Sequence, residues 1–440
     1  MIQGTASGSG KSLVVTALCR IFSDMGHNVA PFKAQNMALN SFITPDGGEI
    51  GRAQALQAEA ARVEPHTDMN PVLLKAQGDS SSQVILQGKV FGSMKAAEYY
   101  SFRERAWERV TRSFDALASR HDLIFMEGAG SPAEINLMDV DIVNMAMAEY
   151  AQAAVLLVGD IDRGGVFASL YGTVQLLGSR SSRIKGFIIN KFRGDRAILD
   201  PGLSMISGKT GIPVAGVVPH IARTGLPEED GLVLSQQAGY GRRTTEAGAV
   251  RVAVVRLQHI SNFTDFDPLG HEPDVDLVYT QNPAEIESAD LVILPGTKNT
   301  VKDLLSLREQ GIDRSITRAF DKGAQIAGIC GGFQMLGSRI SDRSHVESNY
   351  DEVDGLGLLD IETEFDDTKT TCQVEASLLA GGFPCGGMHQ VIRGYEIHMG
   401  RSSGSIGLFR KRPLEDVSDL AEALEDQRVA DGLTDYVSFC

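Results

Sequence analysis

A glycine-rich loop near the start of the chain, Gly4-Thr5-Ala6-Ser7-Gly8-Ser9-Gly10-Lys11-Ser12, constrains the fold more than any other feature. Gly8 and Gly10 allow backbone N–H groups to turn toward an anion. Lys11 can reach the outer phosphates of ATP, and Ser12 can bind Mg²⁺, while the following helix directs its positive end at the same place. The first glycine stands one position earlier than in the strict phosphate-loop spacing, so a plain Gly/Ser turn is the alternative.

Short apolar runs alternate with segments of helical length after this loop. They are found at residues 122–126, 154–158, 186–189 and 214–218. The first three are followed by Glu, Gly, Asp or Asn, which is typical of buried strands that end at a ligand-binding edge. The pattern predicts a parallel sheet with helices on both faces.

Three polar positions follow these strands and are candidate site residues. Glu127 stands at the end of the first strand, where a carboxylate can support Mg²⁺ directly or through water. Asp162 lies in a turn with Asp160 and Arg163, which we interpret as part of the same site. Asn190 ends the next strand and could read the nucleotide base. The alternatives are a surface glutamate, a capped turn with an ion pair and a simple strand end.

The composition limits the classes of partner. The 440 residues carry a formal net charge of −16, which argues against nucleic acid or an anionic membrane as the main partner. The five cysteines have no CxxC spacing, so a reduced cytoplasmic setting is expected. A homo-oligomer is compatible with the sequence.

A second series of strands begins after a change in composition. Residues 223–249 are rich in Gly, Glu and Arg and are interpreted as a linker. Apolar runs return at residues 251–255, 291–296 and 324–328. The sequence therefore predicts two doubly wound α/β domains, residues 1–222 and 250–440, in keeping with the two or three domains expected for this length.

The last of these runs leads into Gly328-Ile329-Cys330-Gly331-Gly332. Glycines on both sides permit a sharp strand-to-helix turn that presents a nucleophile, and the helix start favours the thiolate of Cys330. The N–H group of Gly331 could stabilise an oxyanion, with Gly296 as a second donor. A buried, inert cysteine is the alternative. His345, His389 and His398 are the downstream candidates for a general base.

These motifs together resemble the cobyric acid synthase family. The resemblance rests on the glycine-rich loop and on the turn at residues 328–332, which we call the elbow. It also rests on residues 35–41, 48–55, 69–75, 127–137, 160–167, 190–195 and 395–400. It implies a dethiobiotin-synthetase-like domain followed by a class I glutaminase-like domain. It also implies that ATP and Mg²⁺ are used to amidate the b, d, e and g carboxylates of a corrinoid a,c-diamide. Cys330 would release ammonia from glutamine, and ammonia would attack an acyl phosphate.

The chain departs from this family near its end. The family carries its glutaminase histidine in a later segment similar to Gly-Thr-Tyr-Leu-His-Gly, and no such segment is present. We therefore expect a truncated or frame-shifted glutaminase half, with His398 a weak candidate for the missing base. The alternatives are a homologue limited to free ammonia, a phosphate-loop ATPase with a protein partner, and a corrinoid-binding protein without amidase activity.

Overall fold

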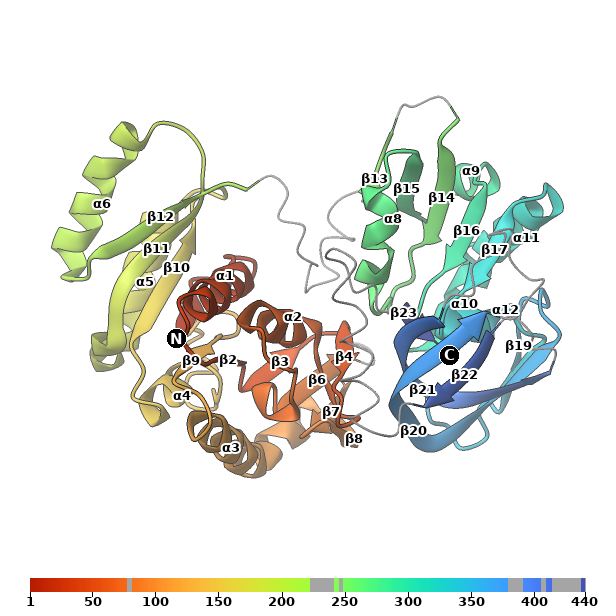
Figure 1. Ribbon diagram of the computed structural model, residues 1–440, viewed down its shortest axis with the longest axis horizontal. Coiled ribbons are helices and arrows are strands. Elements are labelled where there is room, and N and C mark those ends of the chain that lie inside the picture. Colours follow the sequence, from red (N-terminus) through yellow and green to blue (C-terminus); the bar gives the residue numbers. More distant parts are fainter. Residues whose placement is uncertain are drawn as a thin grey trace. The chain divides into compact units, whose positions relative to one another are not determined.

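The computed structural model describes residues 1–76, 81–221, 241–244, 248–378, 391–404, 409–413 and 437–439. Most of the predicted linker and residues 414–436 of the predicted divergent ending lie outside this range. The chain forms two compact units (Figure 1). The first unit comprises Met1–Met37, Ile50–Leu74 and Ser80–Leu226, and the second comprises Ala38–Glu49, Lys75–Asp79 and Pro227–Cys440.

The first unit is built on a parallel sheet, as the sequence predicts. Its four strands lie in the order β1-β10-β11-β12. They are β1 (Ile2–Gly4), β10 (Val155–Asp160), β11 (Ile184–Phe192) and β12 (Val214–Pro219). β2 (Val29–Phe32) pairs in parallel with β9 (Leu123–Met126), and a parallel bridge between Ile2 and Glu127 connects this pair to β1. The carboxyl ends of β1, β9, β10 and β11 therefore lie at one edge.

Alternate residues of β10 and β11 pack into two different cores. Leu157 and Ile189 lie in a core with α4 (Met145–Tyr150), α5 (Val166–Leu177) and α6 (Arg196–Thr210). Val158 and Ile188 lie in a core with α1 (Lys11–Asp24). Because successive side chains of a strand point to opposite faces, these helices cover both faces of the sheet. This explains why the strands read as continuous apolar runs.

A second group of elements completes the first unit. It contains α2 (Arg52–Ala61), α3 (Ala96–Ala118) and a sheet with the strand order β3-β6-β7-β8. These strands are β3 (Gln35–Met37), β6 (Val72–Ala76), β7 (Ser81–Leu86) and β8 (Lys89–Lys95). Short 3₁₀ helices of the first unit are at Thr67–Met69 and Gly178–Arg183. None of the helices in the described ranges is long and apolar enough to cross a membrane.

The second unit has its own largely parallel sheet, in the order β13-β15-β14-β16-β17. The strands are β13 (Gly241–Arg242), β14 (Val250–Val255), β15 (Val275–Thr280), β16 (Leu291–Leu294) and β17 (Gln325–Gly328). The accompanying helices are α8 (Asp267–His271), α9 (Pro283–Glu287), α10 (Thr300–Glu309), α11 (Ile312–Asp321) and α12 (Gly331–Leu336), with a 3₁₀ turn at Phe263–Phe266. β13 is antiparallel to β15, and the other pairs are parallel.

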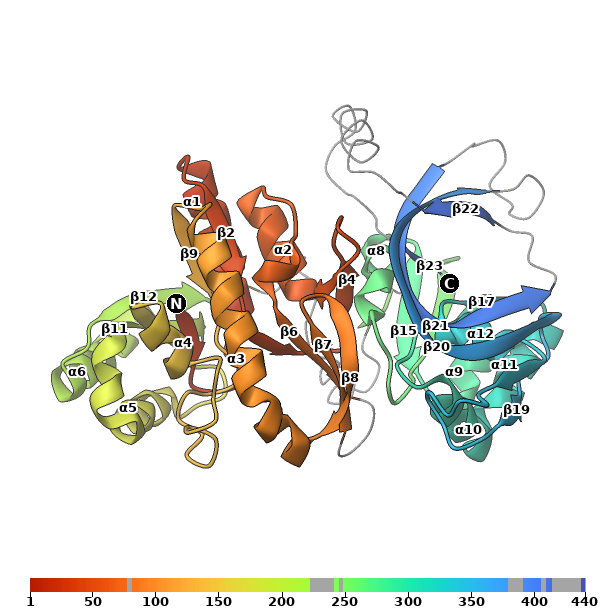
Figure 2. The same ribbon diagram turned by 90° about the horizontal axis from the view of Figure 1, so that it is seen from below.

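A largely antiparallel layer, which the sequence analysis did not anticipate, follows α12. Its long strands, β20 (Ile361–Leu378) and β21 (Val391–Gly404), pair along most of their length and curve together (Figure 2). The shorter strands are β18 (Arg339–Ser341), β19 (Glu352–Asp354), β22 (Phe409–Pro413) and β23 (Val437–Phe439). The β18–β20 and β21–β23 pairs are parallel, and the other pairs are antiparallel. The layer places residues 397–399 beside the strand-to-helix turn after β17.

A hairpin from the N-terminal part of the sequence belongs to the second unit. It consists of β4 (Ser41–Ile43) and the first residue of β5 (Glu49–Gly51), and the Thr44 N–H closes it on Gly48 O at 2.8 Å. The hairpin docks on the antiparallel layer through buried polar contacts. The Tyr395 hydroxyl donates to Ser41 O at 3.2 Å and accepts from Asn262 Nδ2 at 3.0 Å.

Replacing Tyr395 with Phe tests whether these contacts hold the hairpin in place. Tyr395 is fully buried, so the change keeps the ring but leaves the amide of Asn262 and the Ser41 carbonyl without the hydroxyl. We expect the free energy of unfolding of the second unit to fall by about 1–2 kcal/mol, measured by urea denaturation. The exposed Tyr171 provides the control, and a Tyr171→Phe change should cost almost nothing. Equal effects of the two changes would contradict the docking role.

Candidate functional site

The glycine-rich loop of the first unit has the backbone shape that an anion site requires. Gly8 and Gly10 have positive φ values of 70° and 95°, a conformation that L side chains rarely adopt. A Cβ atom on Gly10 would lie 2.0 Å from Nδ2 of Asn190, so the approach of this side chain also demands glycine. α1 begins directly after the loop, at Lys11.

Lys11 and Ser12 connect the loop to the neighbouring strand end. Lys11 Nζ donates to Ala6 O at 3.1 Å and to Gly130 O at 3.2 Å. The hydroxyl of Ser12 donates to Oε1 of Glu127 at 2.9 Å. The two residues predicted to support a metal ion are thus neighbours, as the parallel strand order requires.

Glu127 is also held by two residues that the sequence analysis missed. Lys33 Nζ lies 3.0 Å from its Oε1, and Nε2 of Gln57 donates to Oε2 at 2.6 Å. Lys33 and Glu127 are both almost completely buried. A buried carboxylate needs such partners, because desolvation of an uncompensated charge costs several kcal/mol. The arrangement favours Glu127 as a group that orients Ser12 and a water ligand.

The other predicted positions of this site lie around the same loop. Nδ2 of Asn190 donates to Ser9 O at 2.9 Å, and so it braces the loop; its interpretation as a base reader stays a prediction. Asp160 accepts from Lys191 Nζ at 2.9 Å, and Lys191 also donates to Gly8 O at 2.8 Å. Asp162 is paired with Arg193 at 3.1 Å on the exposed side of the turn.

The donor set fits a nucleotide with Mg²⁺. Mg²⁺ prefers oxygen ligands and usually keeps several waters beside one or two protein groups and substrate phosphates. The Ser12 hydroxyl and the Glu127 carboxylate are of this type. The hydroxyl of Ser9 is buried in the loop and has no hydrogen-bond partner among the described residues, which leaves a donor for a phosphate oxygen.

The second unit contains the predicted elbow. Cys330 lies between β17 and α12 with φ 51° and ψ −115°, outside the regions that non-glycine residues favour. Strain of this kind costs about 1–3 kcal/mol and is typical of functional residues held by their surroundings. A Cβ atom on Gly332 would meet Leu294 O at 2.0 Å, and one on Gly328 would meet the Phe333 Cα at 2.6 Å. These glycines therefore let the turn pack against neighbouring backbone.

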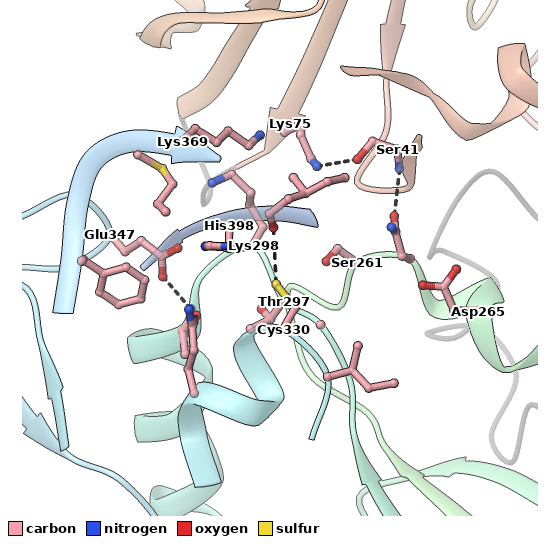
Figure 3. A pocket seen from close by; sticks show the side chains of 18 of the residues that line it. Ser41, Lys75, Ser261, Asp265, Thr297, Lys298, Cys330, Glu347, Lys369 and His398 are labelled. Atoms are coloured by element: carbon pink, nitrogen blue, oxygen red, sulfur yellow. Dashed lines mark hydrogen bonds between the residues drawn. The ribbon is translucent and has the colours of Figure 1, made fainter. Parts of the chain in front are cut away.

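A pocket forms around Cys330 within the second unit (Figure 3). Gly296 lies beside the thiol, since a Cβ atom on it would be 3.6 Å from Cβ of Cys330. Its carbonyl accepts from the Ser261 N–H at 2.9 Å, which fixes the loop after β16. Gly331 starts α12 and is packed against Thr297. The structure thus brings together the three residues predicted for thiol chemistry.

His398 lines the same pocket, which the sequence could not establish. Its Nδ1 lies 2.7 Å from Gly400 O, and its Nε2 is 3.8 Å from Oε2 of Glu396. Burial lowers the pKa of His398, but Glu396 and Cys330 raise it, and the net shift is upward. Sγ of Cys330 contacts the carbonyl oxygen of Ile397, the residue before His398, at 3.4 Å. Of the other candidates, His345 is half-exposed and bonds to Ser348 O, and His389 lies outside the described residues.

Lys75 and Lys369 line the upper side of this pocket in Figure 3, and they form with Glu49 a buried ionic cluster to which no role was assigned from the sequence. Glu49, from the docked hairpin, lies 2.7 Å from Lys75 Nζ and 2.5 Å from Lys369 Nζ. Burial alone would raise the pKa of Glu49, but the two lysines hold it far below its ordinary value. Burial lowers the pKa of Lys369 to about 8, against the opposing influence of Glu49.

Two further charged residues, Lys298 and Glu347, line the pocket. Burial lowers the pKa of Lys298, and the nearby Glu347 carboxylate opposes this. Burial raises the pKa of Glu347, against the influence of Lys298 and of the Thr300 N–H, which donates to its Oε2 at 2.8 Å. The only local sequence signal for such residues is a charge at the end of an apolar run, as in Val72-Leu73-Leu74-Lys75.

Replacing Glu49 with Gln tests the cluster. The change leaves the ammonium groups of Lys75 and Lys369 buried without their carboxylate, and we expect a loss of about 3–5 kcal/mol in the free energy of unfolding near pH 7. The Glu49–Lys369 attraction is complete below a pH of about 8, where Lys369 is protonated, and is lost as the pH rises through that value. The loss should therefore be smaller at about pH 9.5.

Urea denaturation at both pH values measures the effect. Glu309→Gln, an exposed change at the end of α10, is the control. A loss for Glu49→Gln that is equal at both pH values would contradict an ionic origin.

Comparisons with known proteins agree with this division of sites. Residues 1–232 match the model of the CobQ/CobB/MinD/ParA nucleotide binding domain. Residues 251–435 match the model of the CobB/CobQ-like glutamine amidotransferase domain. The phosphate loop lies in the first region and the Cys330 elbow in the second.

Relatives match nearly the whole chain. The cobyric acid synthase of Thermodesulfovibrio yellowstonii is 52% identical over 410 residues, which cover 93% of this chain and 82% of the relative. That of Syntrophobacter fumaroxidans is 49% identical, with coverage of 93% and 80%. That of Sorangium cellulosum is 53% identical, with coverage of 91% and 79%. The chain therefore belongs to the cobyric acid synthase family, the glutamine amidotransferase ligases of cobalamin biosynthesis.

Proposed function

We propose that this chain converts the b, d, e and g carboxylates of adenosylcobyrinic acid a,c-diamide to amides, with ATP, Mg²⁺ and glutamine. The observation that carries the proposal is the presence, in one chain, of a phosphate loop with a Ser12–Glu127 pair and of a strained thiol elbow. We place the ATP-dependent half in residues 1–222 and the glutaminase half in residues 250–440, with a linker between them. Among the described residues, Cys19, Cys330 and Cys372 form no disulfide bond, and we propose a reducing compartment.

The ATP-dependent half gives the substrate carboxylate a good leaving group. A carboxylate is a poor acyl donor, and transfer of the γ-phosphoryl group of ATP converts it to an acyl phosphate. Gly8, Gly10 and Lys11 would hold the phosphates, and Ser12 and Glu127 would hold Mg²⁺, which would supply charge neutralisation for the transferred group. Asn190 holds the loop in shape. We assign Asp162 and its turn to the neighbourhood of the carboxylate that is activated.

The second half supplies nitrogen. Cys330 Sγ attacks the side-chain amide carbon of glutamine, the C–N bond breaks, and a thioester forms as ammonia leaves with a proton from a general acid. The N–H groups of Gly331 and Gly296 stabilise the oxyanion. His398 is the histidine that lines the Cys330 pocket within the described residues, and we assign the proton transfers to it. Water then hydrolyses the thioester to glutamate.

The test is amidation of the a,c-diamide with ATP and Mg²⁺, with either ¹⁵N-amide glutamine or ¹⁵N-ammonium as the nitrogen source. Mass spectrometry counts the amides that are formed. We expect product with both sources; product with ammonium alone would identify the ammonia-limited homologue. If neither source gave product, the chain would be a nucleotide- or corrinoid-binding protein and the proposal would be wrong.

Two variants separate the halves. Cys330→Ser should reduce glutamine-dependent amidation by roughly 10³-fold or more and leave ammonium-dependent amidation unchanged, since only the first needs the nucleophile. Lys11→Ala should reduce both by roughly 10²-fold or more, because it removes charge from the phosphate site. Loss of ammonium-dependent turnover in Cys330→Ser would show that the thiol is structural.

A further inference from the structure

Lys298 and Glu347 carry opposite charges in the Cys330 pocket, and none of the steps above uses them. Lys298 belongs to the loop that also presents Gly296, and its N–H donates to His259 O at 3.0 Å. Glu347 is fixed by the Thr300 N–H at the start of α10. Lys298 therefore extends from backbone next to Gly296, and the Glu347 carboxylate is held at the start of α10.

The two side chains are not paired with each other. The Lys298 ammonium makes no hydrogen bond or ion pair with any described residue, although Glu347 and Cys330 lie close enough to influence its charge. Its carboxylate neighbour, Glu347, uses one oxygen on the Thr300 N–H. An ammonium and a carboxylate that line a pocket without touching leave room for a ligand that carries the complementary charges.

The other two lysines of the pocket are already engaged. Lys75 and Lys369 both bind Glu49, at 2.7 Å and 2.5 Å. The substrate expected at Cys330 is a zwitterion: the glutamine amide carbon is separated by two methylene groups from a carbon that carries a carboxylate and an ammonium. A site that holds both groups fixes the amide against the thiol.

We propose that Lys298 binds the α-carboxylate of glutamine and Glu347 binds its α-ammonium, so that this pair selects glutamine among primary amides. The proposal rests on the proposed function of Cys330 as the glutaminase nucleophile. It assigns the pair a role in recognition, in addition to any effect of the lysine charge on the thiol. Charge-assisted hydrogen bonds of this kind are worth about 1.5–3 kcal/mol each, or roughly 10- to 100-fold in affinity.

Alkylation of Cys330 tests the proposal without any need for turnover. The probes are 6-diazo-5-oxo-L-norleucine, which has the complete glutamine head group, and iodoacetamide, which has none. In Lys298→Met we expect the second-order rate constant for the diazoketone to fall roughly 10- to 100-fold relative to that for iodoacetamide, a ratio that cancels any effect of the lost charge on the thiolate. Lys302→Met, an exposed change in the adjacent helix, is the matched control and should alter neither rate. Mass spectrometry of the Cys330 peptide follows both reactions.

A second variant tests the other half of the pair. Glu347→Gln keeps an oxygen for the Thr300 N–H but removes the charge. It should slow the diazoketone roughly 10-fold and leave unchanged the rate for a des-amino diazoketone, which lacks the group that Glu347 is proposed to bind.

The outcomes separate recognition from the alternatives. Equal slowing of the diazoketone and iodoacetamide in Lys298→Met would show that the lysine acts on the thiol or on folding, and would overturn the proposal. Unchanged rates for both reagents in Lys298→Met would also overturn the proposal. So would a native protein that shows no preference for the diazoketone over iodoacetamide. Ammonium-dependent amidation by Lys298→Met reports separately on the proposed function, since that reaction does not need the glutamine pocket.

Discussion

The contact between Glu49 and two lysines is the interaction on which the second unit depends most. Glu49 belongs to a hairpin that the chain forms in the middle of its nucleotide-binding sequence, and Lys369 lies 320 residues further on. An isolated buried carboxylate is unfavourable, and so are two adjacent ammonium groups; the cluster is stable only when all three are present. The hairpin is therefore held in the unit that contains Cys330 by charge as well as by the hydroxyl of Tyr395.

Strain at Cys330 is compatible with this rigid surrounding. A positive φ at a non-glycine residue persists where neighbouring backbone leaves no alternative, and Gly328 and Gly332 allow that close approach. The same geometry places the thiol at the start of α12, against the loop of Gly296. The first unit uses glycine differently: positive φ values at Gly8 and Gly10 shape a loop around an anion. In both cases a few residues of backbone, at the end of a parallel strand, determine the chemistry.

The parts of the structure that are local in sequence could be predicted. The loop from Gly4 to Ser12, the strand that precedes Glu127 and the turn at Cys330 each need only neighbouring residues and the periodicity of buried strands. The ionic cluster could not be predicted, because its members are separated by 26 and 320 residues and meet only through the docked hairpin. His398 is a similar case: β20 and β21 must pair in one register before its position beside Cys330 is defined. A one-residue slip would turn it to the other face.

The charges around Cys330 also constrain one another. Lysines near a thiol favour the thiolate and the oxyanion, but a pocket with only lysines would lose protons, as the lowered pKa values of Lys298 and Lys369 indicate. Glu49 and Glu347 oppose this loss of protons. A zwitterionic substrate adds one charge of each sign and leaves the balance unchanged. A simple amide would add none, and so the half-buried charges of Lys298 and Glu347 would gain no contact with a ligand charge. Discrimination between amides then follows from those missing contacts.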